Sequence, residues 1–434
     1  MKLKKTISIV IAGVMLVSVI GGCLSKSPVA EKPLTAIVNA KIFDGENLIT
    51  DTTVVIKDGI ILTVGGDIPE GTIIIDADGG TLMPGLIDSH VHTDMDGLRD
   101  ALKFGITTEL EMQGQWSAKK REKVANTSDV ADLRSSGMGV TAKDGHPTQY
   151  MKDSSNFLIR WFFKFPAVGS PNEAVAFVDK QVENGADYIK IFIEDGDNIG
   201  YPGLPTLDDE TLQAAVDEVH RLDKMAIVHV TSVEGTKRAV AIGVDGLGHL
   251  FFDDQPDKEL VDDIAAKNIF VIPTLVTLST AFGNDAKWLA DDKRVSSKLS
   301  KEWLESLSRS MNVHPEGKLE DAYATVIALY NAGVDILAGS DVSEPIPILG
   351  GLAHGASLHH ELQLLVAAGF TPTEALRAAT SIPARRFALS DRGWIVPGAR
   401  ADLLLVDGDP LTDISDTLSI RAVWREGVPL SAQE

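Results

Sequence analysis

The sequence is poor in cysteine and in basic residues, and each shortage excludes a class of protein. One cysteine in 434 residues excludes an internal disulfide framework and a cysteine-rich zinc module. Lys and Arg number 40 against 62 Asp and Glu, for a net charge of −22, so binding to a nucleic-acid backbone is disfavoured. The composition is 44% hydrophobic and 24% charged residues, which is typical of a globular protein with a sizeable core.

Long apolar runs are also scarce, and the one of note stands at the N-terminus. Lysines precede an apolar run over residues 7–20, and two glycines then lead to Cys23. This order is typical of a secretory signal peptide, and the run is shorter than the roughly 18–20 residues that a membrane-spanning helix needs. We predict a signal peptide over 1–22 and a tether over 23–33. An uncleaved N-terminal anchor is the alternative.

The end of this segment resembles a prokaryotic lipobox. The resemblance implies lipidation of Cys23 and a lipid-anchored location outside the cytoplasm. No second apolar run approaches membrane length, so we expect the protein to touch the membrane only through this anchor.

Short β-rich segments occur at both ends of the remaining chain. Between residues 34 and 82 they are separated by Gly and Asp turns, and a similar texture returns near the C-terminus. Each end is too small to bury a core alone. We therefore predict one composite β-sandwich made from 34–83 and 393–434.

The middle of the chain alternates apolar strand-like runs with segments of helical period. Eight such runs over about 310 residues predict an α/β fold, a (β/α)8 TIM barrel over 84–392. A doubly wound open sheet gives the same alternation, but no Gly-rich dinucleotide loop or P-loop follows any run, which favours the barrel. The runs cover 82–87, 106–110, 139–142, 188–193, 226–230, 244–247, 269–273 and 334–338.

Histidine, lysine and aspartate side chains lie at the ends of these runs, where a (β/α)8 barrel forms its active site. The residues are His90, His92, Lys190, His229, His249 and Asp341. Any one of them alone is more simply explained as a structural residue, and Lys190 as a rim lysine. Together, imidazoles and a carboxylate suit Zn²⁺, so the set predicts a metal site.

Two segments resemble the metal-dependent amidohydrolase superfamily: Pro84–His92 resembles its opening and Pro397–Asp407 its closing strand. The resemblance covers the mature chain and implies a barrel that carries a sandwich built from both termini. It also implies two metal ions, one bound by His90, His92 and Asp341 and the other by His229 and His249.

Lys190 indicates the subtype within that superfamily. An ammonium beside two dications is disfavoured by charge, whereas a carbamate formed from CO₂ and the neutral amine is an anion that can bridge both ions. The resemblance is closest to prolidase-type and Xaa-Arg dipeptidases and N-acyl-amino-acid hydrolases, with imidazolonepropionase more distant. Deaminases of the superfamily carry a Glu close after the histidine of the fifth strand, which corresponds here to His229 in the run 226–230. In this chain the next Glu is Glu234, five residues after His229, so deamination is disfavoured.

The chain departs from those relatives at two places. Thr231 stands where they often carry a second histidine, and Glu194–Asp197 stands where they often show Ser-Gly-Gly. Both places are where a substrate would lie, so the exact substrate stays open.

The other histidines have weaker signals. His146 follows the third run, and relatives have a Gly-His at a similar place, so we predict a hydrogen-bond donor to the scissile carbonyl or the leaving group, with a loop histidine as the alternative. His354 is a candidate substrate contact if its loop folds inward. We interpret the rest as structural: His220, His314, His359 and His360.

The predicted function is hydrolysis of an amide or peptide-like C–N bond in a small molecule, a dipeptide or an N-acyl amino acid. Two divalent ions, expected to be Zn²⁺, lower the pKa of a bridging water, and Asp341 carries its proton to the leaving nitrogen. A cyclic amide, lactone or ester hydrolase and a catalytically silent lipoprotein are the alternatives. Self-association into a homo-oligomer is left open.

Overall fold

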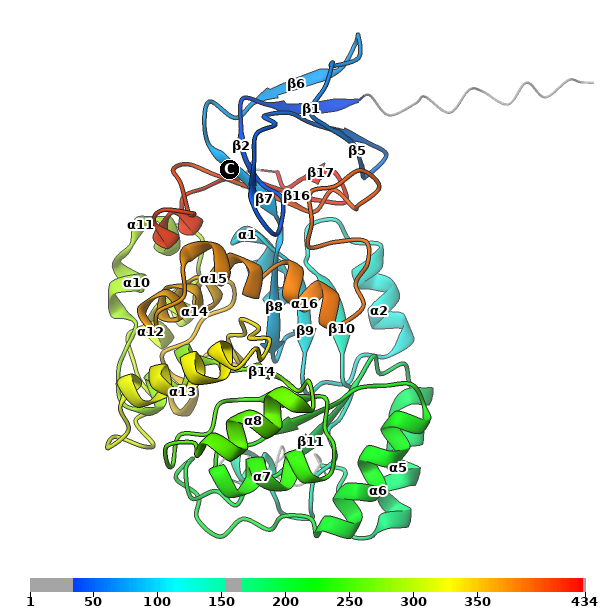
Figure 1. Ribbon diagram of the computed structural model, residues 1–434, viewed down its shortest axis with the longest axis vertical. Coiled ribbons are helices and arrows are strands. Elements are labelled where there is room, and N and C mark those ends of the chain that lie inside the picture. The colour runs from blue at the N-terminus through cyan, green and yellow to red at the C-terminus, as the bar shows by residue number, and fades with distance from the viewer. Residues whose placement is uncertain (1–33, 153–164, 432–434) are drawn as a thin grey trace, which may run out of the picture. The chain divides into compact units, whose positions relative to one another are not determined.

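The computed structural model describes residues 34–152 and 165–431, which belong to one compact unit (Figure 1). The predicted signal peptide, the tether and Cys23 lie outside these residues. Within the described ranges, no helix is both long and apolar enough to cross a bilayer.

Strands from the two ends of the described chain share one sheet. Its order is β17-β16-β15-β7-β2-β3, and a second sheet has the order β5-β4-β1-β6. In the first, β7 pairs antiparallel with β15, with Leu82 opposite Leu405. The strands are β1 (Thr35–Val38), β2 (Lys41–Phe43), β3 (Leu48–Ile49), β4 (Val54–Lys57), β5 (Ile60–Val64), β6 (Ile73–Asp76), β7 (Thr81–Pro84), β15 (Leu403–Val406), β16 (Ile420–Arg425) and β17 (Val428–Pro429).

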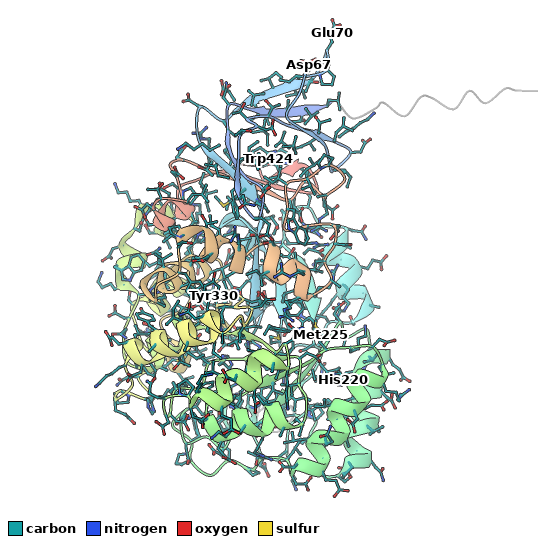
Figure 2. The ribbon with its side chains drawn as sticks, viewed as in Figure 1. Asp67, Glu70, His220, Met225, Tyr330 and Trp424 are labelled. Atoms are coloured by element: carbon teal, nitrogen blue, oxygen red, sulfur yellow. The ribbon has the colours of Figure 1, made fainter. Side chains whose placement is uncertain are left out.

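The two sheets share a small core of their own. Ile37 and Ile56 from one sheet and Leu82, Leu403 and Trp424 from the other are buried in it. Trp424 is labelled in Figure 2, on a strand of the C-terminal segment. Neither end of the chain contributes enough apolar side chains for this core alone, so the pairing of β7 with β15 is what makes it sufficient.

Seven strands of the middle of the chain form two parallel sheets, in the orders β10-β9-β8 and β11-β12-β13-β14. Their side chains are almost all buried, as in sheets covered on both faces. They are β8 (Leu86–Val91), β9 (Ile106–Glu111), β10 (Asp132–Ser135), β11 (Ile189–Phe192), β12 (Ala226–His229), β13 (Gly246–Gly248) and β14 (Phe270–Ile272).

Further contacts connect the two parallel sheets. A parallel bridge joins Val140 to Ile191 of β11, and another joins Val271 of β14 to Ile336. On the other side, the Ser89 amide of β8 donates to the Ala338 carbonyl at 2.9 Å. These contacts follow the order expected for a (β/α)8 barrel, and the fold is compatible with that prediction.

The first, third and eighth predicted runs differ from the observed strands. The run 334–338 contributes only a single bridge, at Ile336. The run 82–87 is divided between β7 and β8, and the chain passes between sheets at Gly85, where a Cβ would lie 2.3 Å from the Thr107 side chain. The run 139–142 contributes single bridges, while β10 lies at 132–135. All three stretches are largely apolar and buried, so hydrophobicity alone did not mark these boundaries.

Helices connect the parallel strands. The sequence has helical periodicity over 173–184, 209–222, 233–242 and 321–332, and the structure has α5, α6, α7 and α13 in these segments. Side chains of Ser170, Asp208 and Ser232 accept hydrogen bonds at the N-termini of the first three. The helices are α1 (Met95–Lys103), α2 (Ala118–Ala125), α3 (Thr148–Lys152), α5 (Pro171–Glu183), α6 (Asp209–Arg221), α7 (Val233–Ala241), α8 (Lys258–Ala266), α9 (Leu275–Ala281), α10 (Lys287–Asp291), α11 (Lys293–Ser296), α12 (Lys301–Leu307), α13 (Leu319–Asn331), α14 (Ala356–Ala367), α15 (Pro372–Ala378), α16 (Ser381–Arg386) and the 3₁₀ helices η1 (Pro347–Leu349) and η2 (Ile414–Leu418).

A buried ion-pair network ties the parallel strands to the C-terminal segment. The Asp132 carboxylate, at the start of β10, accepts hydrogen bonds from Arg392 and Arg400. Burial alone would raise the pKa of Asp132, but the two guanidinium groups outweigh it and hold that pKa below its ordinary value. The carboxylate is therefore ionised in the folded protein at neutral pH.

We expect Asp132→Ala to lower the free energy of unfolding by about 1–3 kcal/mol, because it removes the carboxylate that two buried arginines share, while Asp391 still accepts from Arg392 and Asp402 from Arg400. Urea denaturation of the mature chain measures the change. Because the folded pKa is lowered, the wild-type advantage should be complete above pH ~4 and fade as the pH falls toward the folded pKa.

Asp129→Ala is the matched control for this experiment. Asp129 pairs with Arg99 at 3.0 Å on the surface, and such pairs contribute only about 0–1 kcal/mol. Equal losses from both variants would contradict a special role for the buried network.

Candidate metal centre

The six predicted ligands all line one cavity of about 270 Å³. Three of them lie within strands: His90 in β8, Lys190 in β11 and His229 at the end of β12. His249 directly follows β13. His92 directly follows β8, and Asp341 follows the segment bridged at Ile336. The side chains meet because the carboxyl ends of parallel strands lie at one edge of their sheets.

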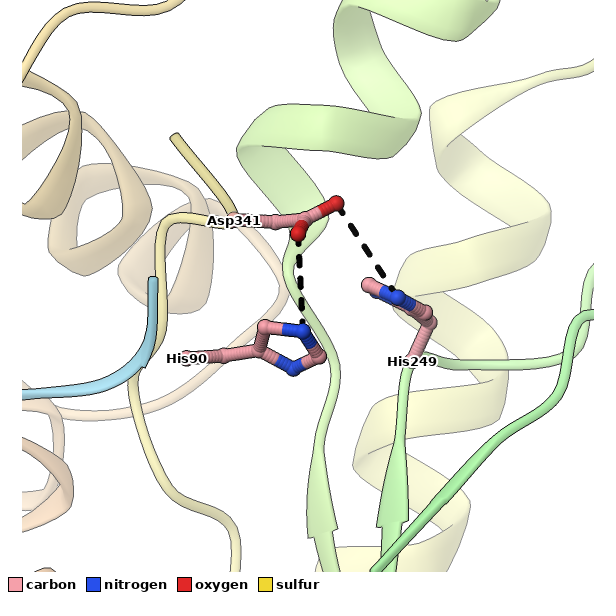
Figure 3. Close-up of side chains that lie close together, drawn as sticks. All are labelled: His90, His249 and Asp341. Atoms are coloured by element: carbon pink, nitrogen blue, oxygen red, sulfur yellow. Dashed lines mark ion pairs between the residues drawn. The ribbon is translucent and has the colours of Figure 1, made fainter. Parts of the chain in front are cut away.

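Asp341 is the common partner of three imidazoles. Its Oδ1 lies 3.4 Å from His90 Nε2 and 3.1 Å from His92 Nε2, and its Oδ2 lies 3.9 Å from His249 Nε2. Figure 3 shows the contacts with His90 and His249. The ligand atoms of His90, His249 and Asp341 lie within 4.8 Å of one another, close enough to hold one metal ion.

The backbone of Asp341 is held in an unusual conformation. Its φ is +53°, in the left-handed region, and its amide donates to the His90 carbonyl at 2.7 Å. Backbone strain of this kind persists where the surrounding structure enforces it, and it gathers at functional sites. The hydrogen bond fixes the carboxylate against β8.

The buried imidazoles are in the form that binds metals. Burial first, and then neighbouring His and Lys side chains, lower the pKa values of His90, His229 and His249 well below their ordinary range. These rings are therefore neutral at physiological pH, which metal coordination requires. His249 Nδ1 contacts Thr274 Oγ1 at 2.8 Å, so its Nε2 is the nitrogen that faces Asp341.

Lys190 lies in the middle of this group. Its side chain is 1% exposed, and its Nζ is 3.2 Å from His90 Nε2. Burial lowers the pKa of Lys190 to about 7, so a large share of the amine is neutral at neutral pH. In the part of the chain that the structure describes, no carboxylate lies within 4 Å of Nζ to pair with an ammonium.

Glu194, which the sequence showed only as a departure from the relatives, also contacts this group. Its Oε2 lies 3.1 Å from His229 Nε2 and accepts a hydrogen bond from Thr231 Oγ1 at 2.6 Å. The available signal was an acidic residue four positions after Lys190, at the end of the same apolar strand. Sequence position alone did not reveal its contact with β12.

The two other predicted site histidines lie in different surroundings. His146 lines the cavity, its ring stacks on His229 with centroids 4.4 Å apart, and its Nδ1 contacts Gln149 Nε2 at 2.8 Å. His354 is not among the described residues that line the cavity. It is buried instead, with Nδ1 3.7 Å from Glu109 Oε1.

Away from the ligands, the cavity wall is mainly apolar. Among the described lining residues, Lys190 and Asp341 are the only members of the Lys, Arg, Asp and Glu residue types. Uncharged polar side chains include those of Gln113, Asn198, Thr231, Thr277 and Ser343. The apolar and aromatic wall includes Tyr150, Phe165, Phe192, Tyr201, Phe252, Leu278, Met311, Val313, Ile348 and Leu349.

The donor set as a whole fits divalent metal ions. Among the residues that the structure describes, His90 Nδ1 is buried and has no hydrogen-bond partner, so the protein leaves this ring available to a ligand. Neutral imidazoles with a carboxylate are the donors that Zn²⁺ prefers.

Comparison with known proteins places most of the chain in one group. Residues 81–430 match the sequence model of the amidohydrolase family. The chain is 24% identical to ochratoxinase from Aspergillus niger over 88% of its length and 83% of that protein, and 24% identical to imidazolonepropionase from Rhodococcus jostii over 88% and 86%. A solved structure of a Xaa-Pro dipeptidase with bound methionine has a TM-score of 0.71 at 22% identity, over 91% of this chain and 99% of that one.

We expect the purified metal-replete protein to hold close to two divalent ions per chain, measured by elemental analysis. Six donors are too many for one open tetrahedral site. Asp341→Asn should lower the metal content, because it removes the charge shared by three imidazoles.

His220→Ala is the control, since His220 (labelled in Figure 2) lies on α6 and contacts Asp245 rather than the cavity. One ion or fewer in the wild type would contradict a binuclear centre.

Proposed function

This chain belongs to the amidohydrolase family, and from that premise we propose that it is a metal-dependent hydrolase of an amide C–N bond. The observation that carries the proposal is the meeting of His90, His92, Lys190, His229, His249 and Asp341 in one cavity. We take the two parallel sheets as parts of one (β/α)8 barrel over 84–392, with the other two sheets as a composite β-sandwich.

Two groups of residues would hold the metal ions. We assign His90, His92 and Asp341 to one ion, His229 and His249 to the other, and a carbamate on Lys190 to both. When bound, the ions, which we expect to be Zn²⁺, supply an acidified water and polarise a carbonyl oxygen.

The chain's own residues then move protons and orient the substrate. Asp341 accepts the proton of the attacking water and delivers it to the leaving nitrogen, a role supported by its contacts with three imidazoles. His146 lines the same cavity and is suited to donate a hydrogen bond to the carbonyl or the leaving group.

For the substrate we propose a dipeptide or an N-acyl amino acid. The apolar wall of the cavity supports a substrate with an apolar side chain or acyl group next to the scissile bond. A cyclic amide, lactone or ester hydrolysed at the same centre is the alternative. The other alternative, a catalytically silent lipoprotein that binds a solute, is less well supported. Binding a solute does not require six metal-ligand side chains that converge on one cavity.

We also propose that Cys23 carries a lipid anchor and that the protein is located outside the cytoplasm. Both rest on residues 1–33, for which the resemblance to a lipobox is the support.

The proposed activity is tested with a panel of dipeptides, N-acyl amino acids and lactones, each with an apolar and a charged member. We expect release of an amine from an apolar dipeptide or N-acyl amino acid, its loss on treatment with a chelator, and its return with Zn²⁺. Hydrolysis of lactones alone would favour the alternative, and no hydrolysis by the two-metal protein would contradict an enzyme of this class.

We expect Lys190→Ala to lose most activity and much of the second metal ion, and propionate to restore part of both. A small carboxylate can fill the space left by the lysine and supply the two oxygens of the carbamate. Lys190→Arg should not restore activity, because a guanidinium stays charged and forms no carbamate. Rates and metal content are measured for each variant.

Lys237→Ala is the control, since Lys237 pairs with Asp257 on the surface. Full activity in Lys190→Arg would leave Lys190 as an ordinary buried lysine and remove it from the proposed centre.

A further inference from the structure

The Glu194 carboxylate is enclosed by hydrogen-bond donors from two separate strand ends. Its side chain is 1% exposed. Oε1 accepts from the Gly196 amide at 2.8 Å, and Oε2 accepts from Thr231 Oγ1 at 2.6 Å and faces His229 Nε2 at 3.1 Å. A buried carboxylate without partners is costly, so these contacts account for its presence beside the cavity.

The loop that carries Glu194 is built to keep it there. Gly196 has a φ of +88°, and a Cβ at that position would lie 1.9 Å from the Tyr201 carbonyl oxygen, so only glycine fits. Asn198 Nδ2 donates to the Thr231 carbonyl at 3.0 Å. The loop after β11 is thereby tied to the end of β12, which bears His229.

The contact with His229 determines which ring nitrogen carries the proton. A neutral imidazole has one N–H. Both carboxylate oxygens of Glu194 already accept hydrogen bonds, Oε1 from the Gly196 amide and Oε2 from Thr231 Oγ1, so Oε2 faces the ring as an acceptor. The hydrogen bond to Glu194 therefore places that proton on Nε2, and Nδ1 keeps the lone pair that a metal ion needs. A carboxylate behind a histidine ligand also makes the ligand more basic.

We propose that Glu194 is a positioning residue that holds His229 as the Nε2–H tautomer, leaving Nδ1 as its metal-binding nitrogen. This inference deepens the proposed function and rests on it for the assignment of His229 as a ligand. Glu194 acts through His229, because His229 is among the described residues that line the cavity and Glu194 is not. Thr231 supports the same carboxylate oxygen.

The test uses Glu194→Gln and Glu194→Ala in the full mature protein, first stripped of metal. Zn²⁺ affinity is measured by competition with a chromophoric chelator, and the His229 tautomer by ¹⁵N NMR of the imidazole rings, assigned with His229→Gln. We expect the weaker Zn²⁺ site to lose about 10–100-fold in affinity in both variants, more in Glu194→Ala. We also expect the Nε2–H signal of His229 to weaken in favour of Nδ1–H.

Two further variants separate positioning from general damage. Glu218→Gln makes the same change at a shielded carboxylate that pairs with Arg221 on α6, and it should leave both readouts unchanged. Thr231→Val keeps the His229 contact and loses one donor to Oε2, so its loss of affinity should be smaller than that of Glu194→Ala.

The outcomes also distinguish this inference from the proposed function. Unchanged Zn²⁺ affinity and an unchanged His229 tautomer in Glu194→Ala would overturn it, even if the enzyme hydrolyses amides. Complete loss of one ion with His229 still Nε2–H would also overturn it, because Glu194 would then be a direct ligand. A weakened site with a shifted tautomer supports the inference, even if no substrate in the panel is cleaved.

Discussion

The structure of the cavity depends on keeping several buried nitrogen donors close together around one carboxylate. Asp341 lies between 3.1 and 3.9 Å from three imidazole nitrogens, and Lys190 lies 3.2 Å from one of the same rings. These groups can share a buried space only if most of them are neutral, and burial lowers the pKa values of His90, His229, His249 and Lys190 accordingly. The same neutrality leaves nitrogen lone pairs available for cations.

The surrounding residues decide how each donor is presented. Thr274 contacts His249 Nδ1, Glu194 contacts His229 Nε2, and Gln149 contacts His146 Nδ1. In each ring one nitrogen is engaged by a neighbour, so the other is the one that remains for chemistry. Two residues differ from those common in the relatives: Glu194, which follows β11, and Thr231, which follows β12. Their side chains contact each other.

The terminal segments stabilise the parallel strands from outside the cavity. The pairing of β7 with β15 builds a second core, and Asp132 links β10 to arginines that precede β15. The chain passes from β7 into β8, and β8 carries His90, so the composite sheet also fixes the entry of the strand that leads to the ligands.

The sequence by itself determined the amidohydrolase membership, confirmed by the family match, and it named the residues that the structure brings to one cavity. It could do so because apolar strand runs are visible in the sequence and parallel strands place their ends at one edge. Only the tertiary structure decided the division of the run 82–87 at Gly85, the position of His354 away from the cavity lining, and the contact of Glu194 with His229. These depend on side chains and loops that are distant in sequence, by 35 residues for Glu194 and His229, and no local pattern of polarity records which of them touch.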